Sequence, residues 1–290
     1  MKATMQQIFS DLESGAVGSF NVLDLNMALA VIESAETLQV PAIVGVASRH
    51  FDAINTPVLA PSLVRAIENA RVPIALHLDH AGPDQMNMIN QALDLGFSSI
   101  MIDGSTLPFA DNVSITRQVV QASKVYGASV EGELGGIAGE EGVADSGTDT
   151  PDTMPYTDAL EAKRFVEETG IDALAIAVGT AHGIYAAQPQ ISFDTIGSCA
   201  VTAEIPLVMH GATGVADADL QHAVRGGVRK INFFSGLLKE GMDEVRSRAN
   251  AEGNDFLAFN QALRDRWCSI ISDQMKLYAL ISNDSKTAAA

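Results

Sequence analysis

The sequence has few basic residues. Only 18 lysines and arginines stand against 36 aspartates and glutamates, giving a formal net charge of −18. A chain this acidic is repelled by nucleic-acid phosphates and by anionic lipid head groups, so we expect neither as a partner. The charge still permits an anionic small substrate, because a binding site needs positive potential only locally, from a metal ion or from helix N-termini.

Cysteines and long apolar runs are also scarce. The two cysteines, Cys199 and Cys268, match no metal-binding or redox spacing, so we expect reduced thiols and a cytoplasmic protein. No apolar run is long enough to span a membrane. The first residues, MKATMQQIFSDLESG, read as an amphipathic helical start without the apolar core of a signal peptide.

The chain does contain a regular alternation of short apolar runs with segments of helical spacing. The expected strands are 17–22, 41–47, 73–78, 98–102, 128–134, 173–178, 206–210 and 228–233. The expected helices between them are 25–38, 58–70, 85–95, 113–125, 157–169, 193–200 and 217–224. With 290 residues, of which 47% are hydrophobic, the chain can bury a large core. Eight strands alternating with helices predict an α/β fold, a single (β/α)8 TIM barrel.

The predicted barrel fills one domain, residues 1–282. A doubly wound open sheet is the alternative, but no Gly-x-Gly-x-x-Gly follows the first strand. Two further helices, 236–249 and 256–281, exceed what the barrel needs, and we expect them to cover a barrel end or to contact another subunit of a dimer or tetramer. The tail, 283–290, is predicted to be disordered.

One stretch, 72–82, ends a buried strand in titratable groups. It reads VPIALHLDHAG, and alternation along a strand places His77 and Asp79 on one face. His80 reaches the same site only if the strand ends near Asp79, which the following Gly82-Pro83 favours. We interpret His77 as a hydrogen-bonded structural histidine, and Asp79 and His80 as functional, because chemistry in parallel α/β folds lies at the carboxyl ends of strands.

Polar residues recur at the ends of the other strands. They are Asn21, Ser48, Asp103, Ser105, Glu131, Glu133, His182, His210, Asn232 and Ser235. In a barrel these ends converge on one mouth, so His80, His182 and His210 are expected to face one point. Three neutral imidazoles with an open fourth position are typical of catalytic zinc.

Two glycine-containing loops follow late strands. GTAHG at 179–183 and HGATG at 210–214 expose backbone N–H groups, and Thr180, Thr213 and Ser235 add hydroxyl donors. Late loops of this barrel often bind phosphate in this way. The pair of loops therefore predicts a phosphate site at the mouth.

Taken together, the motifs resemble one family. Between about residues 5 and 245 the sequence contains, in this order, the motifs FNV, HLDH, MIDGS, VEGELG, GTAHGxY (where x is any residue), PLVMHG and KIN. In this order they resemble the class II, metal-dependent ketose-phosphate aldolases, which include the fructose- and tagatose-bisphosphate enzymes. The resemblance implies a carbon–carbon lyase that reversibly cleaves a phosphorylated ketose to dihydroxyacetone phosphate and an aldehyde.

The resemblance also implies roles for individual residues. His80, His182 and His210 fall on the zinc ligands, and Glu133 on a carboxylate that holds the metal in an alternative position. Asp79 falls on an acid/base, and Glu141 on a loop glutamate that handles the α-carbon proton, with Glu140 as the neighbouring alternative. The substrate pocket is implied to contain Asn21, Ser48, Gly183, Gly211, Thr213, Asn232 and Ser235. A monovalent cation, Na⁺ or K⁺, is implied near the phosphate.

The chemistry agrees with these roles. Zinc bound by neutral ligands keeps its full charge, so it can polarise a ketone and stabilise the enediolate that C–C cleavage leaves. One carboxylate must take the hydroxyl proton and a second must protonate the carbanion. The glycine- and acid-rich segment 135–154, which carries Glu141, is predicted to be a mobile loop that closes over the substrate.

Two departures from the family pattern bear on the substrate. Ala212 replaces a glycine after His210, and Phe233-Phe234 replaces a stretch that is usually small or acidic. We expect Phe233 to pack in the barrel wall and Phe234 to point to the pocket, disfavouring fructose 1,6-bisphosphate. Arg49, Arg225 and Arg229 are candidates for a second phosphate, without a motif. A non-catalytic barrel subunit of a partner aldolase, and a metal-dependent sugar-phosphate epimerase or isomerase, remain the alternative functions.

Overall fold

Eight parallel strands close into a barrel in the computed structural model, which describes residues 1–137, 147–148, 155–248 and 255–281. The strands are β1 (Val17–Asn21), β2 (Ala42–Ala47), β3 (Ile74–Ala81), β4 (Ser99–Ile102), β5 (Ser129–Leu134), β7 (Ala173–Ile176), β9 (Leu207–Met209) and β10 (Val228–Asn232). Their order around the barrel is β1-β10-β9-β7-β5-β4-β3-β2. The predicted TIM barrel is confirmed.

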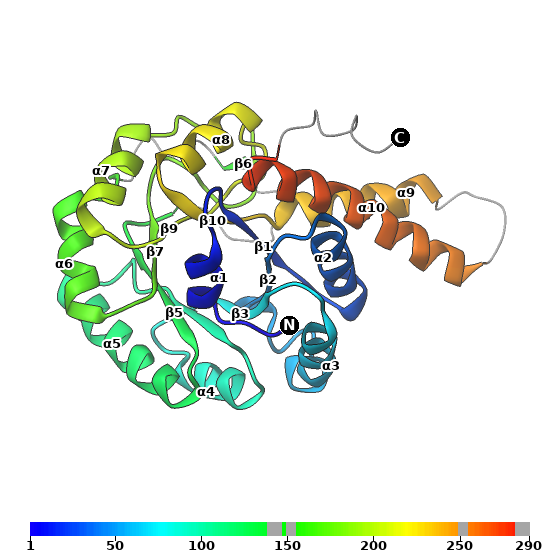
Figure 1. The fold of residues 1–290 in the computed structure, drawn as a ribbon, viewed down its shortest axis with the longest axis horizontal. Coiled ribbons are helices and arrows are strands. Elements are labelled where there is room, and N and C mark those ends of the chain that lie inside the picture. Colours follow the sequence, from blue (N-terminus) through cyan, green and yellow to red (C-terminus); the bar gives the residue numbers. More distant parts are fainter. Residues whose placement is uncertain (138–146, 149–154, 249–254, 282–290) are drawn as a thin grey trace.

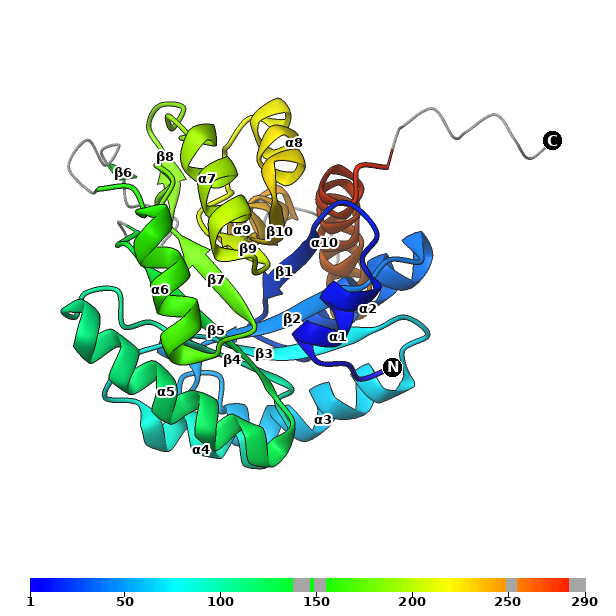
Figure 2. The same cartoon turned by 60° about the vertical axis from the view of Figure 1, so that its left-hand side comes forward.

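Helices surround this barrel, as Figures 1 and 2 show. The ring consists of α2 (Leu25–Leu38), α3 (Thr56–Asn69), α4 (Met86–Asp94), α5 (Phe109–Tyr126), α6 (Ala159–Thr169), α7 (Phe193–Ala203) and α8 (Asp217–Gly226). Their apolar faces and the outward residues of the strands form one continuous core. A 3-10 turn, η1 (Ser48–His50), follows β2, and a short parallel pair, β6 (Gly147–Thr148) with β8 (Ile184–Tyr185), lies outside the barrel sheet.

Helix α1 (Met5–Asp11) closes the end of the barrel where the strands begin. Its N-terminus is fixed by a capping box, in which Thr4 accepts from the Gln7 N–H and the Gln7 side chain accepts from the Thr4 N–H. Met5 and Ile8 are fully buried and pack against inward-facing strand residues. The other members of this apolar cluster are Val17, Ile43, Ala75, Met101, Ala173, Ala175 and Val208.

Two additional helices at the C-terminus, α9 (Ser235–Arg248) and α10 (Phe256–Tyr278), confirm the predicted extension. Figure 1 shows them side by side, projecting beyond the ring. Helix α10 packs along α2 and α9, and Trp267 donates its indole N–H to the Leu237 carbonyl at 3.1 Å. At the start of α10, Phe256 and Leu257 are exposed.

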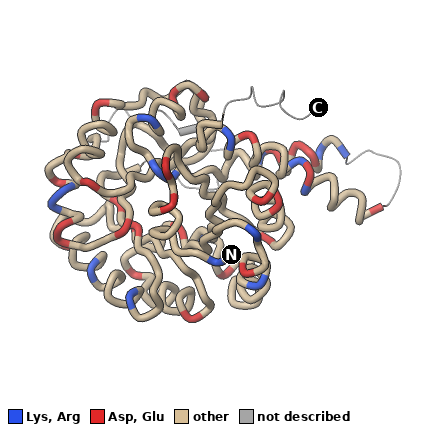
Figure 3. Tube along the Cα trace, viewed as in Figure 1, with Lys and Arg blue, Asp and Glu red and all other residues tan. Residues whose placement is uncertain are grey.

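Acidic and basic residues are interspersed around the outer helices of the described chain (Figure 3). None of the helices described is long and apolar enough to cross a membrane. The predicted disordered tail, 283–290, and Glu140 and Glu141 with most of the predicted loop lie outside the described residues.

Candidate active site

The sequence expectation that the third strand ends near Asp79 is wrong. Strand β3 continues to Ala81, but its register against β4 shifts between Leu78 and Ala81. His80 lies in this irregularity with a φ of +52°, a left-handed conformation that is rare for residues other than glycine. The Ser48 hydroxyl, at the end of β2, donates to the His80 carbonyl. The bulge, rather than a strand end, turns His80 toward the barrel mouth.

Three histidines meet at that mouth, as predicted. His80 Nε2 lies 2.9 Å from His210 Nδ1, and each of the three residues offers a ring nitrogen within 4.8 Å of the others. The ring centroids of His80 and His182 are 4.8 Å apart. Burial, together with the neighbouring imidazoles, lowers the pKa of His182 well below its ordinary value and that of His210 to about 4. Both are therefore neutral at neutral pH, with ring lone pairs available to a metal.

Asp79 is buried beside the histidines and held by two amides. The Asn21 side chain donates to Asp79 Oδ2 at 2.7 Å, and the Asn232 side chain donates to Oδ1 at 3.2 Å. Gly45 on β2 makes room for Asn21, because a Cβ at Gly45 would come within 2.1 Å of Asn21 Oδ1. His77 Nε2 lies 3.4 Å from Asp79 Oδ1, and His77 Nδ1 contacts Ser99 Oγ at 2.7 Å, in keeping with a structural histidine.

Two carboxylates lie near the Nδ1 atom of His80, on the side of the ring away from His210. Asp103 Oδ2 is 3.3 Å from His80 Nδ1, and Glu133 Oε2 is 3.9 Å from the same nitrogen. Burial would raise the pKa of Asp103, but interactions with His80 and Ser105 hold it below its ordinary value. Burial, with the charge of Asp103, raises the pKa of Glu133 well above normal. His80, Asp103 and Glu133 thus form a second group able to hold a metal.

Asp103 and Glu131 are among the polar residues expected at the mouth, but the sequence assigns no individual role to them or to Lys230. Glu131 and Lys230 form an ion pair inside the barrel, with Nζ 2.8 Å from Oε2 and both side chains fully buried. The sequence feature that could have identified this pair is strand alternation, which puts Glu131 on the same face as Glu133, and Lys230 on the same face as Asn232. For Asp103, the signal is its position directly after β4.

The glycine loops line a narrow cavity beside the histidines. Its lining consists of His182, Gly183, Gly211, Ala212, Thr213, Asn232, Phe234 and Ser235. Gly211 has a φ of +68°, and a Cβ there would come within 2.2 Å of the Ala181 carbonyl oxygen, so only glycine lets the two loops approach. The Gly236 N–H donates to Thr213 Oγ1 at 3.1 Å, joining this loop to the start of α9.

Both aromatic residues after β10 are buried. Phe233 packs against Gly236, as expected for a wall residue, since a Cβ on Gly236 would meet its ring at 2.3 Å. Phe234 lines the cavity, and its ring meets that of His50 edge-on at a centroid distance of 5.6 Å. The structure thus places Phe234 on the pocket side.

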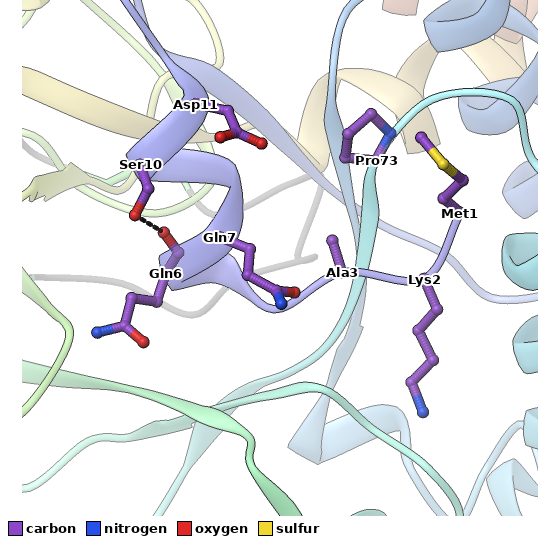
Figure 4. A pocket seen from close by; sticks show the side chains of 8 residues that line it. All are labelled: Met1, Lys2, Ala3, Gln6, Gln7, Ser10, Asp11 and Pro73. Carbon is purple, nitrogen blue, oxygen red and sulfur yellow. Dashed lines mark hydrogen bonds between the residues drawn. The ribbon is translucent and has the colours of Figure 1, made fainter.

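A second hollow lies at the opposite end of the barrel, beside α1 (Figure 4). It has a volume of about 350 Å³ and is lined by Met1, Lys2, Ala3, Gln6, Gln7, Ser10, Asp11 and Pro73. Its two charged side chains, Lys2 and Asp11, have opposite signs. Nothing here matches the convergence of titratable groups at the mouth.

Comparison with known proteins agrees with this geometry. The family model described as class-II fructose-bisphosphate aldolase matches residues 3–282. The chain belongs to this family. Class II aldolases are carbon–carbon lyases, so the expected enzyme class is confirmed.

Individual relatives of this class II aldolase carry different substrate names. A 6-phospho-5-dehydro-2-deoxy-D-gluconate aldolase from Shouchella clausii is 36% identical over 239 residues, 81% of this chain and 78% of the relative. A fructose-bisphosphate aldolase from Staphylococcus aureus is 36% identical over 234 residues, 79% of each chain. The crystal structure of the YdjI aldolase from Escherichia coli K12 has a TM-score of 0.84 at 29% identity, covering 96% of this chain and 97% of that one.

Proposed function

We propose that this chain is a zinc-dependent aldolase that reversibly cleaves a phosphorylated ketose to dihydroxyacetone phosphate and an aldehyde. The observation that carries the proposal is the convergence of His80, His182 and His210 beside the buried carboxylate of Asp79. A subunit that only stabilised a partner enzyme would have no need of such an arrangement.

The donor set fits zinc. His80 Nδ1 faces Asp103 and His210 Nε2 faces Glu131, so in the neutral rings the lone pairs lie on His80 Nε2 and His210 Nδ1. These two nitrogens are 2.9 Å apart, close enough for one cation to accept both lone pairs. When bound, zinc supplies Lewis-acid polarisation of the substrate ketone.

Asp79 would take the proton from the hydroxyl group β to the ketone during cleavage, and return it in the reverse reaction. Asn21 and Asn232 hold the carboxylate in place from two strands, so little reorganisation is needed when the proton moves. Because Asp79 is fully buried, the transfer takes place out of contact with bulk water.

The substrate phosphate would bind at the loops after β7 and β9 and at the start of α9. Gly183, Gly211, Thr213 and Ser235 line one cavity there, where backbone N–H groups and hydroxyls are the available donors. Asn21, at the end of β1 next to β10, and Ser48, directly after β2, would complete the predicted pocket. A monovalent cation near the phosphate stays a prediction.

Two further roles are proposed on the resemblance. Glu133, with Asp103, would hold the metal in an alternative position next to His80, which their grouping supports. Glu141, or Glu140, would handle the proton on the α-carbon. Glu141→Ala is then expected to slow exchange of the α-proton of dihydroxyacetone phosphate more than it weakens binding, and unchanged exchange would move the assignment to Glu140.

The aldehyde half of the substrate is proposed to be less hydroxylated, shorter or differently charged than in fructose 1,6-bisphosphate. Phe234 supports this, because its ring lines the cavity and cannot hydrogen-bond a sugar hydroxyl. Arg229, one of the arginines considered for a second phosphate, instead donates to the Gly15 and Val224 carbonyls at the far end of the barrel.

We further propose that the chain forms a homo-oligomer, dimer or tetramer, in the cytoplasm. The exposed apolar side chains of Phe256 and Leu257 at the projecting end of α10 support a contact between copies. Light scattering after size-exclusion chromatography tests it, with Phe256→Ser/Leu257→Ser expected to shift the mass toward the monomer.

Metal removal and a substrate panel test the proposed function. Chelation of the purified enzyme should abolish cleavage, and one equivalent of zinc per chain should restore it. The substrates are ketose 1-phosphates and fructose 1,6-bisphosphate, with triose phosphate release as the readout. Full activity in a demonstrably zinc-free sample would refute the zinc dependence. Conversion of substrate without triose release would instead favour an epimerase or isomerase.

A further inference from the structure

A buried ion pair inside the barrel has no part in the mechanism so far. Glu131 on β5 and Lys230 on β10 are both fully buried, with 2.8 Å between Oε2 and Nζ. Two other strands, β7 and β9, separate their strands around the barrel. Taking two charges out of water is costly, and such pairs are often no better for stability than apolar residues of similar volume. The pair therefore calls for a role beyond stability.

The second oxygen of Glu131 provides that role. Glu131 Oε1 lies 3.0 Å from His210 Nε2, and both side chains are fully buried. An ionised carboxylate can only accept, so His210 must carry its hydrogen on Nε2. The Lys230 ammonium, 2.8 Å from Oε2, pairs with Glu131 as a carboxylate.

The other side of the His210 ring faces the mouth. Asn232 Nδ2, which can only donate, lies 3.2 Å from His210 Nδ1, so Nδ1 accepts. The same nitrogen lies 2.9 Å from His80 Nε2. Glu131 on one side and Asn232 on the other thus select a single tautomer, the one whose lone pair points to the histidine cluster.

We propose that Glu131, held by Lys230, is a positioning residue that fixes the ring and tautomer of His210 for metal binding. The inference rests on the proposed zinc site, and it concerns the side chains behind the ligands. Outer-shell partners of this kind typically change metal affinity 10- to 100-fold when they are replaced.

The test separates positioning from stability with a pair of substitutions. Lys230→Met leaves the Glu131 charge buried alone, so this variant is expected to unfold at lower temperature. In Glu131→Leu/Lys230→Met no charge is left unpaired and no acceptor faces His210 Nε2, and the melting temperature is expected to recover. Zinc affinity, measured by competition with a chelator, should nevertheless stay 10- to 100-fold below that of the unaltered enzyme in the double variant.

Ser99→Ala is the matched control. Ser99 Oγ contacts His77 Nδ1 at 2.7 Å, and His77 Nε2 in turn lies 3.8 Å from Glu131 Oε2, so Ser99 is buried near the ion pair but acts on a different histidine. Its zinc affinity should stay within threefold of the unaltered enzyme. Cobalt substitution gives a second readout, because the visible absorption of Co²⁺ should shift in the double variant and not in Ser99→Ala.

The outcomes distinguish this inference from the proposed function. A folded double variant with unaltered zinc affinity and cobalt spectrum would overturn the positioning role while leaving the zinc site in place. If the unaltered enzyme binds no zinc, or if the His182→Ala variant binds zinc as tightly as the unaltered enzyme, both the positioning role and the proposed zinc site are overturned. Reduced affinity in the double variant, with recovered melting temperature and normal Ser99→Ala, supports the inference.

Discussion

The two ends of the barrel interior are equally buried and chemically opposite. At the end closed by α1, the inward residues are apolar, and Met5 and Ile8 complete the packing. At the mouth, the inward residues include Asp79, Glu131 and Lys230, also fully removed from solvent. Burial therefore does not distinguish a structural layer from a functional one in this molecule. The distinction lies in whether the buried groups depend on one another for hydrogen bonds and charge pairing.

Single strands show the change from one layer to the other. Along β3 the inward positions are Ala75, then His77, then Asp79, so polarity rises toward the carboxyl end. Apolar packing tolerates substitution as long as volume is kept, whereas each polar group at the mouth depends on a specific partner. The expected consequence is that the mouth is sensitive to single atoms and to pH, and the closed end mainly to volume.

The largest effect on catalysis by one isosteric substitution is expected at Asp79. Asp79→Asn keeps the shape but cannot accept a proton, so cleavage should fall by roughly 10²–10⁴, the usual contribution of a positioned acid/base. Zinc content should stay at one per chain. Steady-state kinetics and metal analysis check this together. Near-normal cleavage by a metal-loaded variant would reject the role, and loss of zinc would make Asp79 a ligand or a support.

The metal-free protein is expected to lose stability in mild acid through the buried histidines. The pKa of His210 is about 4 when folded, against 6.5 for an ordinary histidine. Below about pH 6.5 the unfolded chain therefore binds a proton that the folded chain does not, so stability falls as pH drops from 6.5 toward 4. His210 alone contributes about 3 kcal/mol to this loss.

Urea unfolding in the presence of a chelator, at pH 7.5, 6 and 5, measures this effect. His210→Gln is the comparison, because it removes the titrating ring while keeping polar atoms at the site. The decline should be steeper in the unaltered protein than in this variant. Equal slopes would show that His210 is not held neutral by the fold.

Much of this contrast between the ends could be predicted from the sequence. The apolar runs and the interval between them give the eight strands, and polar residues at strand ends mark the mouth. His80, His182 and His210 come together as expected because parallel strands bring their carboxyl ends to one rim. These inferences need only local patterns and the closure of the sheet.

Other features depend on contacts that no local pattern encodes. The left-handed His80 is stabilised by the bulge of β3 and by Ser48, which directly follows the neighbouring strand β2, and nothing at His80 itself signals a positive φ. The Glu131–Lys230 pair joins strands far apart in sequence, so it depends on the closed barrel. The edge contact of Phe234 with His50 likewise arises only once β2 and β10 lie near each other across β1.

A smaller effect is expected at Phe234, where the polar mouth contains an apolar surface. Sugar hydroxyls left unpaired against an aromatic ring cost about 1–3 kcal/mol. Phe234→Asp should therefore raise the specificity constant for fructose 1,6-bisphosphate, relative to less hydroxylated ketose 1-phosphates, by roughly 10- to 100-fold. Phe234→Leu, which removes the ring without adding an acceptor, should leave the ratio nearly unchanged.

The comparison of specificity constants decides the role of Phe234. An unaltered enzyme that already prefers fructose 1,6-bisphosphate would show that Phe234 does not exclude that substrate. An unchanged ratio in Phe234→Asp would lead to the same conclusion.

The smallest effect is expected at the closed end. Ile8 is buried against the strand starts, and Ile8→Val removes one methylene group from that apolar cluster. The free energy of unfolding should fall by about 0.5–1.5 kcal/mol, while kcat, KM and zinc affinity stay unchanged, because the cluster lies at the opposite end from the histidines. Denaturant unfolding alongside steady-state kinetics measures both quantities. A change in kcat without a matching change in stability would mean that the apolar end helps to set the geometry of the mouth, and the two ends would have to be treated as one coupled unit.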